Sequence, residues 1–243
     1  MKDCLSADTE HTEVSAQSKN VCVIVFAKYP AHHQAKTRLQ PALGVAGAAQ
    51  MAKRLLLHSV DNALASNFDV ELCVSPAPTD PCWQALHLPK SLCWSTQVKG
   101  DLGSRLWAAS QVALERYRKV VLIGADCPSL TAERIKTAVQ QLDQYDAVMI
   151  PATDGGYVLL GFKKAHQSLF LGVRWSTESV AADTEQRMAA LGWTVSLLAP
   201  LHDIDEPEDL KHLPVGWLNP ATHLDVNNNA NNNTITNASA YPT

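Results

Sequence analysis

The sequence predicts an α/β fold: one Rossmann-like domain of three layers, α/β/α, with a mixed, mostly parallel sheet. Short apolar runs alternate with segments of helical periodicity, as in strands joined by crossover helices. The run from Val120 to Ile123 is wholly apolar, which is typical of a strand buried on both faces of a parallel sheet. Two later runs are separated by only six residues, too few for a crossover helix, and therefore indicate one antiparallel strand.

Each predicted strand is a short run rich in Val, Ile, Leu or Cys, bounded by polar or turn-forming residues. The first is almost entirely apolar, and the fifth and sixth are joined through an Asp-Gly-Gly sequence that favours a tight turn. We expect the strands at residues 21–27, 70–74, 92–95, 120–123, 147–150, 157–161 and 194–198.

Helices are predicted where apolar residues recur every three or four positions, as they do between residues 44 and 66. Thr131 is a favourable N-cap for a helix that runs to Leu142, because its hydroxyl can accept a hydrogen bond from a first-turn N–H. Pro207 suits the first position of a last short helix. Two further helices are expected at residues 102–117 and 178–191.

With 243 residues and a net charge of −4, the chain can form one domain with a full core. We expect this domain at residues 21–215, between a disordered tail at 1–20 and a disordered, Asn-rich tail at 216–243. The lack of a basic stripe argues against a nucleic-acid partner, and no apolar run approaches the roughly 18 residues of a membrane span. Without the apolar segment of a signal peptide, a cytoplasmic location is expected. The sequence does not indicate an oligomeric state.

A basic loop follows the first predicted strand and carries Lys28, Lys36 and Arg38. Ligands of open α/β sheets bind at the carboxyl ends of strands, and lysine and arginine suit phosphate groups. The glycine spacing of a Walker loop is absent. A solvated basic loop is the alternative, but the position after the first strand favours phosphate binding.

A second loop, from Gln97 onwards, leads into the helix predicted from Leu102. Its glycines permit a tight backbone, and its backbone N–H groups could meet a base or a phosphate. An ordinary capped helix start is an equal alternative. The candidate nucleotide-binding residues of this loop are Gln97, Gly100, Asp101, Gly103 and Arg105.

Carboxylates follow two of the predicted strands. Asp126 lies just beyond the strand 120–123, where it could hold Mg²⁺ or Mn²⁺ against phosphate oxygens. Asp203 and Asp205 follow the last strand, and carboxylates from two loops make a better metal site than one. The preference of acidic residues for helix N-termini accounts for the acidic residues after Asp205 better than for these two. Cys127, beside Asp126, is more plausibly a small residue in a tight loop than a reactive thiol.

The turn formed by Asp154, Gly155 and Gly156 precedes Tyr157. It is either a simple hairpin turn or a site in which Asp154 is a general base and Tyr157 stacks on a sugar ring. Trp175 could also contact a sugar, although its chemistry alone favours a place in the core.

Six segments, taken in order, resemble one known family. They are Lys28-x-Pro30 with Lys36-Thr-Arg-Leu39, Gln97 to Leu106, Gly124-Ala-Asp-Cys-Pro128, Asp154-Gly-Gly-Tyr157, Val173-x-Trp-Ser-Thr177 and Asp203-Ile-Asp-x-Pro-Glu-Asp209. The pattern, over about residues 21–213, resembles the bacterial GT-A-fold transferases associated with radical-SAM and selenodomain clusters, often labelled arsenosugar-biosynthesis glycosyltransferases. This resemblance implies a nucleotide-diphospho-sugar transferase fold, with Asp126 as the metal aspartate. The family usually has a glycine where this chain has His33.

The primary hypothesis is a metal-dependent glycosyltransferase that moves a sugar from a nucleotide-diphospho-sugar donor to a small-molecule acceptor. Mg²⁺ or Mn²⁺ on Asp126 and Asp205, with Lys36 and Arg38, would stabilise the leaving nucleoside diphosphate. The basic loop also resembles that of phospholactate guanylyltransferases, which release pyrophosphate, so a nucleotidyltransferase is the alternative. A non-catalytic nucleotide-binding protein is the third hypothesis. Gly155, Gly156, Tyr157 and Trp175 are the candidate sugar and acceptor contacts.

Overall fold

The computed structural model describes residues 19–90 and 92–218. The tails predicted at 1–18 and 219–243 lie outside the described residues. The chain divides into two compact units, residues 1–212 and 213–243, and the fold below is that of the first. None of the helices among the described residues is long and apolar enough to cross a membrane.

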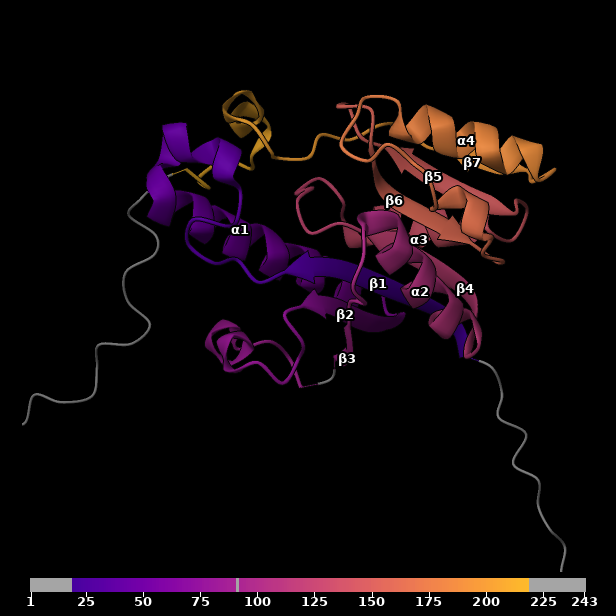
Figure 1. Cartoon of the computed structure of the whole chain (residues 1–243), viewed down its shortest axis with the longest axis horizontal. Helices are drawn as coiled ribbons and strands as arrows, with labels where there is room; N and C mark the ends of the chain where they lie inside the picture. The colour runs from indigo at the N-terminus through magenta and orange to yellow at the C-terminus, as the bar shows by residue number, and fades with distance from the viewer. Residues whose placement is uncertain (1–18, 91, 219–243) are drawn as a thin grey trace, which may run out of the picture. The chain divides into compact units, whose positions relative to one another are not determined.

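The first unit is built on one seven-stranded sheet with the order β3-β2-β1-β4-β6-β5-β7. β1 lies inside the sheet and pairs in parallel with β2 and β4 (Figure 1). β6 is antiparallel to both β4 and β5, which confirms the predicted antiparallel strand. The strands are β1 (Lys19–Lys28), β2 (Asp69–Ser75), β3 (Cys93–Thr96), β4 (Tyr117–Ile123), β5 (Ala147–Pro151), β6 (Tyr157–Phe162) and β7 (Val195–Leu197).

Helices cover both faces of the sheet, as predicted. Successive side chains of a strand point to opposite faces, so Val23 of β1 belongs to one core cluster and Ile24 to the other. The first cluster includes residues of α1 (Gln40–Ala65) and α3 (Ala132–Gln141). The second includes residues of α2 (Leu102–Leu114) and α4 (Val180–Ala190).

Four short 3₁₀ helices complete the fold: η1 (Thr37–Leu39), η2 (Pro81–Leu86), η3 (Gln167–Leu169) and η4 (Pro207–His212). η1, η2 and η3 were not predicted, and the helix expected at Pro207 is a 3₁₀ helix. The predicted cap of α3 is confirmed, because Thr131 Oγ1 accepts a hydrogen bond from the Arg134 N–H at 3.4 Å.

Three predicted boundaries were wrong. The helix 102–117 ends at Leu114, and Tyr117 begins β4 instead, since pairing with β1 and burial of its ring outweigh the helical periodicity. Residues 19 and 20 belong to β1 rather than to a tail. α1 begins at Gln40 rather than at Gly44, where the backbone is non-helical with φ 69°.

Candidate active site

A cleft of about 1170 Å³ opens at the carboxyl ends of β1, β2 and β4. Its walls include the loop after β1, the Ser75-Pro76 segment after β2, and residues 124–126 after β4. Asp205, from the loop after β7, also lines it. Ligands of open α/β sheets bind at this edge, so the fold itself presents the cleft as a binding site.

The loop after β1 contains two non-glycine residues in the left-handed region, His33 with φ 64° and Lys36 with φ 44°. Such residues are uncommon, histidine is among the types that tolerate this region, and they cluster at functional sites. His33 is exposed and occupies the position where the resembled family has glycine. This chain therefore adopts left-handed backbone at this position without a glycine.

Lys36 is the centre of a charged cluster in the cleft. Its Nζ lies 3.2 Å from Asp126 Oδ2 and 3.4 Å from Asp205 Oδ1. Arg38 donates to Asp205 Oδ2 at 3.0 Å and to Glu206 Oε1 at 3.3 Å. Burial acts to lower the pKa of Lys36, but the Asp126 and Asp205 carboxylates outweigh it and raise that pKa. The ammonium group therefore stays charged between two carboxylates.

Backbone contacts bring these carboxylates together from distant parts of the sequence. The Ile204 N–H donates to the Asp126 carbonyl at 2.9 Å, which ties the loop after β7 to the end of β4. Asp209 Oδ2 accepts from the N–H groups of Asp205 and Glu206 at 3.0 and 2.7 Å, so it shapes the acidic loop. Asp126 and Asp205, both predicted metal ligands, thus face one cleft.

These two carboxylates fit Mg²⁺ or Mn²⁺ as a partial ligand set. Mg²⁺ is usually bound through one or two carboxylates, with substrate phosphates and water completing the shell. Among the described residues there is no group of three or more His, Cys, Asp or Glu side chains that could hold a metal alone. The donor set therefore suits a metal that arrives with a phosphate-bearing substrate.

Asp203 differs from the other two aspartates. Burial, followed by the charges of Asp126 and Asp154, raises its pKa to about 7. A carboxyl group that exchanges its proton near neutral pH is suited to acid–base chemistry. Asp203, which was predicted as a metal ligand, is therefore also a candidate for proton transfer.

The turn after β5 has a local structure that explains its glycines. Asp154 is exposed, and its Oδ1 accepts a hydrogen bond from the Gly156 N–H at 2.8 Å. Gly155 has φ 94°, and a Cβ there would lie 2.1 Å from the Glu178 carbonyl oxygen. The hairpin interpretation therefore has geometric support. Asp154 Oδ2 accepts no hydrogen bond from the described residues, but Asp154 is not among the described residues that line the cleft.

The loop that begins at Gln97 forms part of the scaffold behind the cleft. The Gln97 amide donates to the Ala27 and Cys73 carbonyls, at 3.0 Å each, and so joins β1 to β2. Arg105 donates to Gln97 Oε1 at 3.3 Å and to the Gly100 carbonyl at 2.9 Å.

The same loop shapes the start of α2. Asp101 caps the helix by accepting from the Ser104 N–H at 2.8 Å. Gly103 is buried, and a Cβ there would lie 2.0 Å from the Phe170 carbonyl oxygen. These contacts support the capped-helix alternative. Of residues 97–105, only Leu102, the first residue of α2, is among the described residues that line the cleft.

Tyr157 and Trp175 are partly buried and pack edge to face against the second core cluster, with ring centroids 6.4 Å apart. Tyr157 Oη and Trp175 Nε1 are buried without a hydrogen-bond partner among the described residues, and burial raises the pKa of Tyr157. Neither residue lines the cleft. Their position favours the core interpretation over stacking on a sugar.

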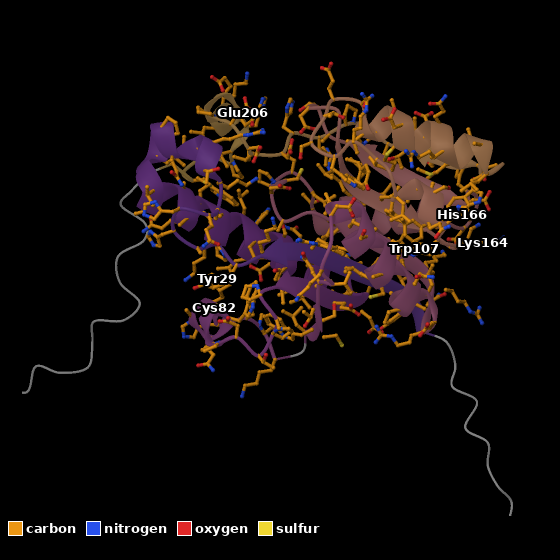
Figure 2. The ribbon with its side chains drawn as sticks, viewed as in Figure 1. Tyr29, Cys82, Trp107, Lys164, His166 and Glu206 are labelled. Atoms are coloured by element: carbon orange, nitrogen blue, oxygen red, sulfur yellow. The ribbon has the colours of Figure 1, made fainter. Side chains whose placement is uncertain are left out.

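Sequence reasoning missed three residues that line the cleft. They are Tyr29 and Cys82, both labelled in Figure 2, and Asp80. The Tyr29 ring packs edge to face on buried Trp83 at 5.3 Å, and Trp83 Nε1 donates to the Pro76 carbonyl at 3.2 Å. The only sequence signal for these residues is that they follow predicted strands. The thiol of Cys127 is buried with its pKa raised to about 12 by that burial, which supports the packing interpretation.

Comparison with known proteins places the chain in a family. A solved structure from Desulfovibrio desulfuricans G20, provisionally named a nucleotide-diphospho-sugar transferase, is 31% identical, with a TM-score of 0.75, over 83% of this chain and 89% of that one. The family described as "Uncharacterized protein conserved in bacteria (DUF2064)" matches residues 59–177. The chain therefore belongs to the family of the Desulfovibrio protein, within the nucleotide-diphospho-sugar transferase superfamily. No curated protein matches the sequence.

More distant structures share the fold alone. 4-diphosphocytidyl-2C-methyl-D-erythritol synthase from Anaerococcus prevotii DSM 20548 is 11% identical, with a TM-score of 0.55 over 80% of this chain and 96% of that one. A cytidylyltransferase from Leptospira borgpetersenii serovar Hardjo-bovis is 14% identical, with a TM-score of 0.52 over 79% and 84%. The same fold thus occurs in proteins named for sugar transfer and in proteins named for nucleotidyl transfer.

Proposed function

We propose that this protein is a metal-dependent glycosyltransferase that uses a nucleotide-diphospho-sugar donor and a small-molecule acceptor. The observation that carries the proposal is the meeting of Asp126, Asp205 and Lys36 in the cleft at the carboxyl ends of the parallel strands. The provisional name of the 31%-identical Desulfovibrio structure supports the sugar donor.

The chain's own residues supply the elements of such a reaction. Asp126 and Asp205 would hold Mg²⁺ or Mn²⁺, whose chemistry is to neutralise charge on the diphosphate. Lys36 and Arg38 would donate to the phosphate oxygens of the leaving nucleoside diphosphate. Because an acceptor hydroxyl ionises far above pH 7, an inverting transfer needs a positioned base. Asp154 is that base in our proposal, and Asp203, whose pKa is near 7, is the competing candidate.

Nucleotidyl transfer is the second candidate function. The fold likeness to cytidylyltransferases favours it, and the same Lys36, Arg38 and aspartates would suit the triphosphate of a nucleotide. The two functions differ in the bond that is broken: a sugar–oxygen bond in glycosyl transfer, and the α–β phosphate linkage in nucleotidyl transfer.

A product screen distinguishes these functions. The purified protein is incubated with Mn²⁺, a panel of sugar nucleotides or nucleoside triphosphates, and sugar and sugar-phosphate acceptors, and the products are identified by mass spectrometry. Glycosyl transfer predicts a nucleoside diphosphate and a glycosylated acceptor. Pyrophosphate release with a nucleotidylated sugar phosphate would replace our proposal by the second candidate. Metal-dependent binding without any product would leave the non-catalytic hypothesis.

A further inference from the structure

We propose that Lys36 acts as a resident cation of the Asp126–Asp205 site, so that a divalent metal binds there strongly only together with the phosphates of a nucleotide. The inference rests on the proposed function and deepens it by assigning a binding order. Lys36 is then a positioning residue that couples two ligands, in addition to any contact it makes with phosphate.

The geometry of Lys36 carries the first step. Its side chain is only 13% exposed, and its ammonium nitrogen lies within hydrogen-bond distance of both carboxylates. The backbone at Lys36 is itself held in place, because Lys36 is left-handed and its carbonyl accepts the Leu39 N–H at 2.9 Å. Leu39 is fully buried and anchors the loop. The ammonium group therefore lies between the two carboxylates, on a loop that is anchored independently of it.

A divalent ion that entered between these carboxylates would meet the ammonium charge at close range. Like charges within a few ångströms repel strongly in a partly buried site. Metal binding without another ligand therefore requires Lys36 to leave two carboxylate partners and gain none in return. This cost weakens the affinity for the metal alone.

A polyphosphate removes that cost. Its oxygens offer the Lys36 ammonium an anionic partner as good as the carboxylates it leaves, and the four-carbon stem of lysine lets the nitrogen move without moving the loop. The exposed Lys28 lines the same cleft and adds to the attraction for phosphate. Because coupling between two ligands is reciprocal, the metal in turn strengthens nucleotide binding.

The test measures Mn²⁺ alone, without nucleotide, by electron paramagnetic resonance titration of the full chain. We expect Lys36→Met to bind Mn²⁺ at least about tenfold more tightly than the wild type, within the usual range of coupling between sites. Lys28→Met is the matched control, since it removes one positive charge from the same cleft and no ion pair among the described residues. Its Mn²⁺ affinity should change less than about threefold. The double variant with Lys36→Met and Asp126→Asn should show no such increase in Mn²⁺ affinity, which would place the metal at Asp126.

Equal Mn²⁺ affinities of the wild type and Lys36→Met would overturn the inference, and so would an equal gain in Lys28→Met. A gain that survives Asp126→Asn would also overturn it, because the metal would then bind elsewhere. These outcomes are independent of the product screen. Glycosyl transfer by a protein without the Lys36 effect would reject the binding order alone, whereas the Lys36 effect without glycosyl product would reject only the proposed function.

Discussion

Two loops at the edge of the sheet are held in opposite ways. The loop after β1 is held by charge pairs to residues far away in the sequence, through Lys36 to Asp126 and Asp205. The turn after β5 is held by hydrogen bonds rather than charge pairs: the Asp154 carboxylate accepts from the Gly156 N–H, and the Gly155 carbonyl accepts from the Ala181 N–H at 2.8 Å. The first loop accepts left-handed backbone at His33 and Lys36, while the second uses glycine at Gly155. A charged ligand can release the charge pairs of the first loop, whereas it offers no replacement for the backbone hydrogen bonds of the second, which is therefore a fixed support.

The largest expected effect comes from breaking the long-range pairing. Asp126→Asn removes the carboxylate charge shared by Lys36 and the metal, so we expect metal-dependent nucleotide binding to weaken by more than about 100-fold, beyond the roughly 10–100-fold typical of outer-shell partners. Titration calorimetry with Mn²⁺ and the donor found in the product screen measures this. Asp143→Asn, which removes a surface carboxylate paired with Lys119, is the control and should bind as the wild type does. Unchanged affinity of Asp126→Asn would show that the metal assignment is wrong.

The second effect tests whether the local turn also has a chemical role. Asn at position 154 keeps the oxygen that accepts the Gly156 N–H, so Asp154→Asn should leave the turn intact. If Asp154 is the general base, kcat falls by roughly 100-fold or more with little change in donor affinity. Asp203→Asn, measured in the same steady-state assay, identifies the base if its kcat falls instead. A loss of donor affinity at unchanged kcat would make Asp154 a binding residue, and no effect would leave it a turn residue.

The third effect concerns stability and compares two glycines with left-handed backbone. Gly155→Ala would place a Cβ 2.1 Å from the Glu178 carbonyl, whereas Gly172→Ala meets nothing within 4 Å. Both substitutions cost about 1–2 kcal/mol for the left-handed backbone, and the clash should bring Gly155→Ala to at least about 3 kcal/mol. Urea denaturation measures both free energies of unfolding. Equal losses in the two variants would show that the segment around Glu178, just before α4, shifts to accommodate the Cβ.

The smallest effect is a pH dependence of stability. The pKa of Asp203 is about 7 in the folded protein against an ordinary value of 3.8. Between about pH 4 and 7 the folded state holds a proton that the unfolded state has lost, so stability falls as pH rises through this window. Asp203→Asn removes that loss. Discounted for partial exposure, the variant should be about 1 kcal/mol more stable than the wild type at pH 8, or roughly 2–4 °C in Tm.

Thermal denaturation in metal-free buffer at pH 4 and pH 8 checks this expectation. The gain should be largest at pH 8 and should vanish at or below pH 4, where both states are protonated. A variant that is less stable than the wild type at pH 8, or a gain that is the same at both pH values, would show that Asp203 is ionised at little cost in the folded protein.

The strands and most of the helices could be predicted because the signals for them lie within each segment of the sequence. Apolar runs gave the strands, the short connection before Tyr157 gave the antiparallel β6, and the hydroxyl of Thr131 gave the start of α3. Asp126 could be placed at the edge of the sheet by the same logic, since a residue directly after a buried parallel strand must lie at its carboxyl end. The sequence by itself therefore determined the α/β class and the edge at which the site lies.

Only the tertiary structure decided which charges meet. Lys36 and Asp205 are brought together by the hydrogen bond of Ile204 to the end of β4, and no local pattern encodes a contact between segments so far apart in the chain. The same holds for Tyr117, which belongs to a strand rather than to the predicted helix, and for Tyr157, which packs partly buried against the core. Hydrophobic periodicity indicates which secondary structure a segment can form. Burial and charge pairing depend instead on the partners that the rest of the chain supplies.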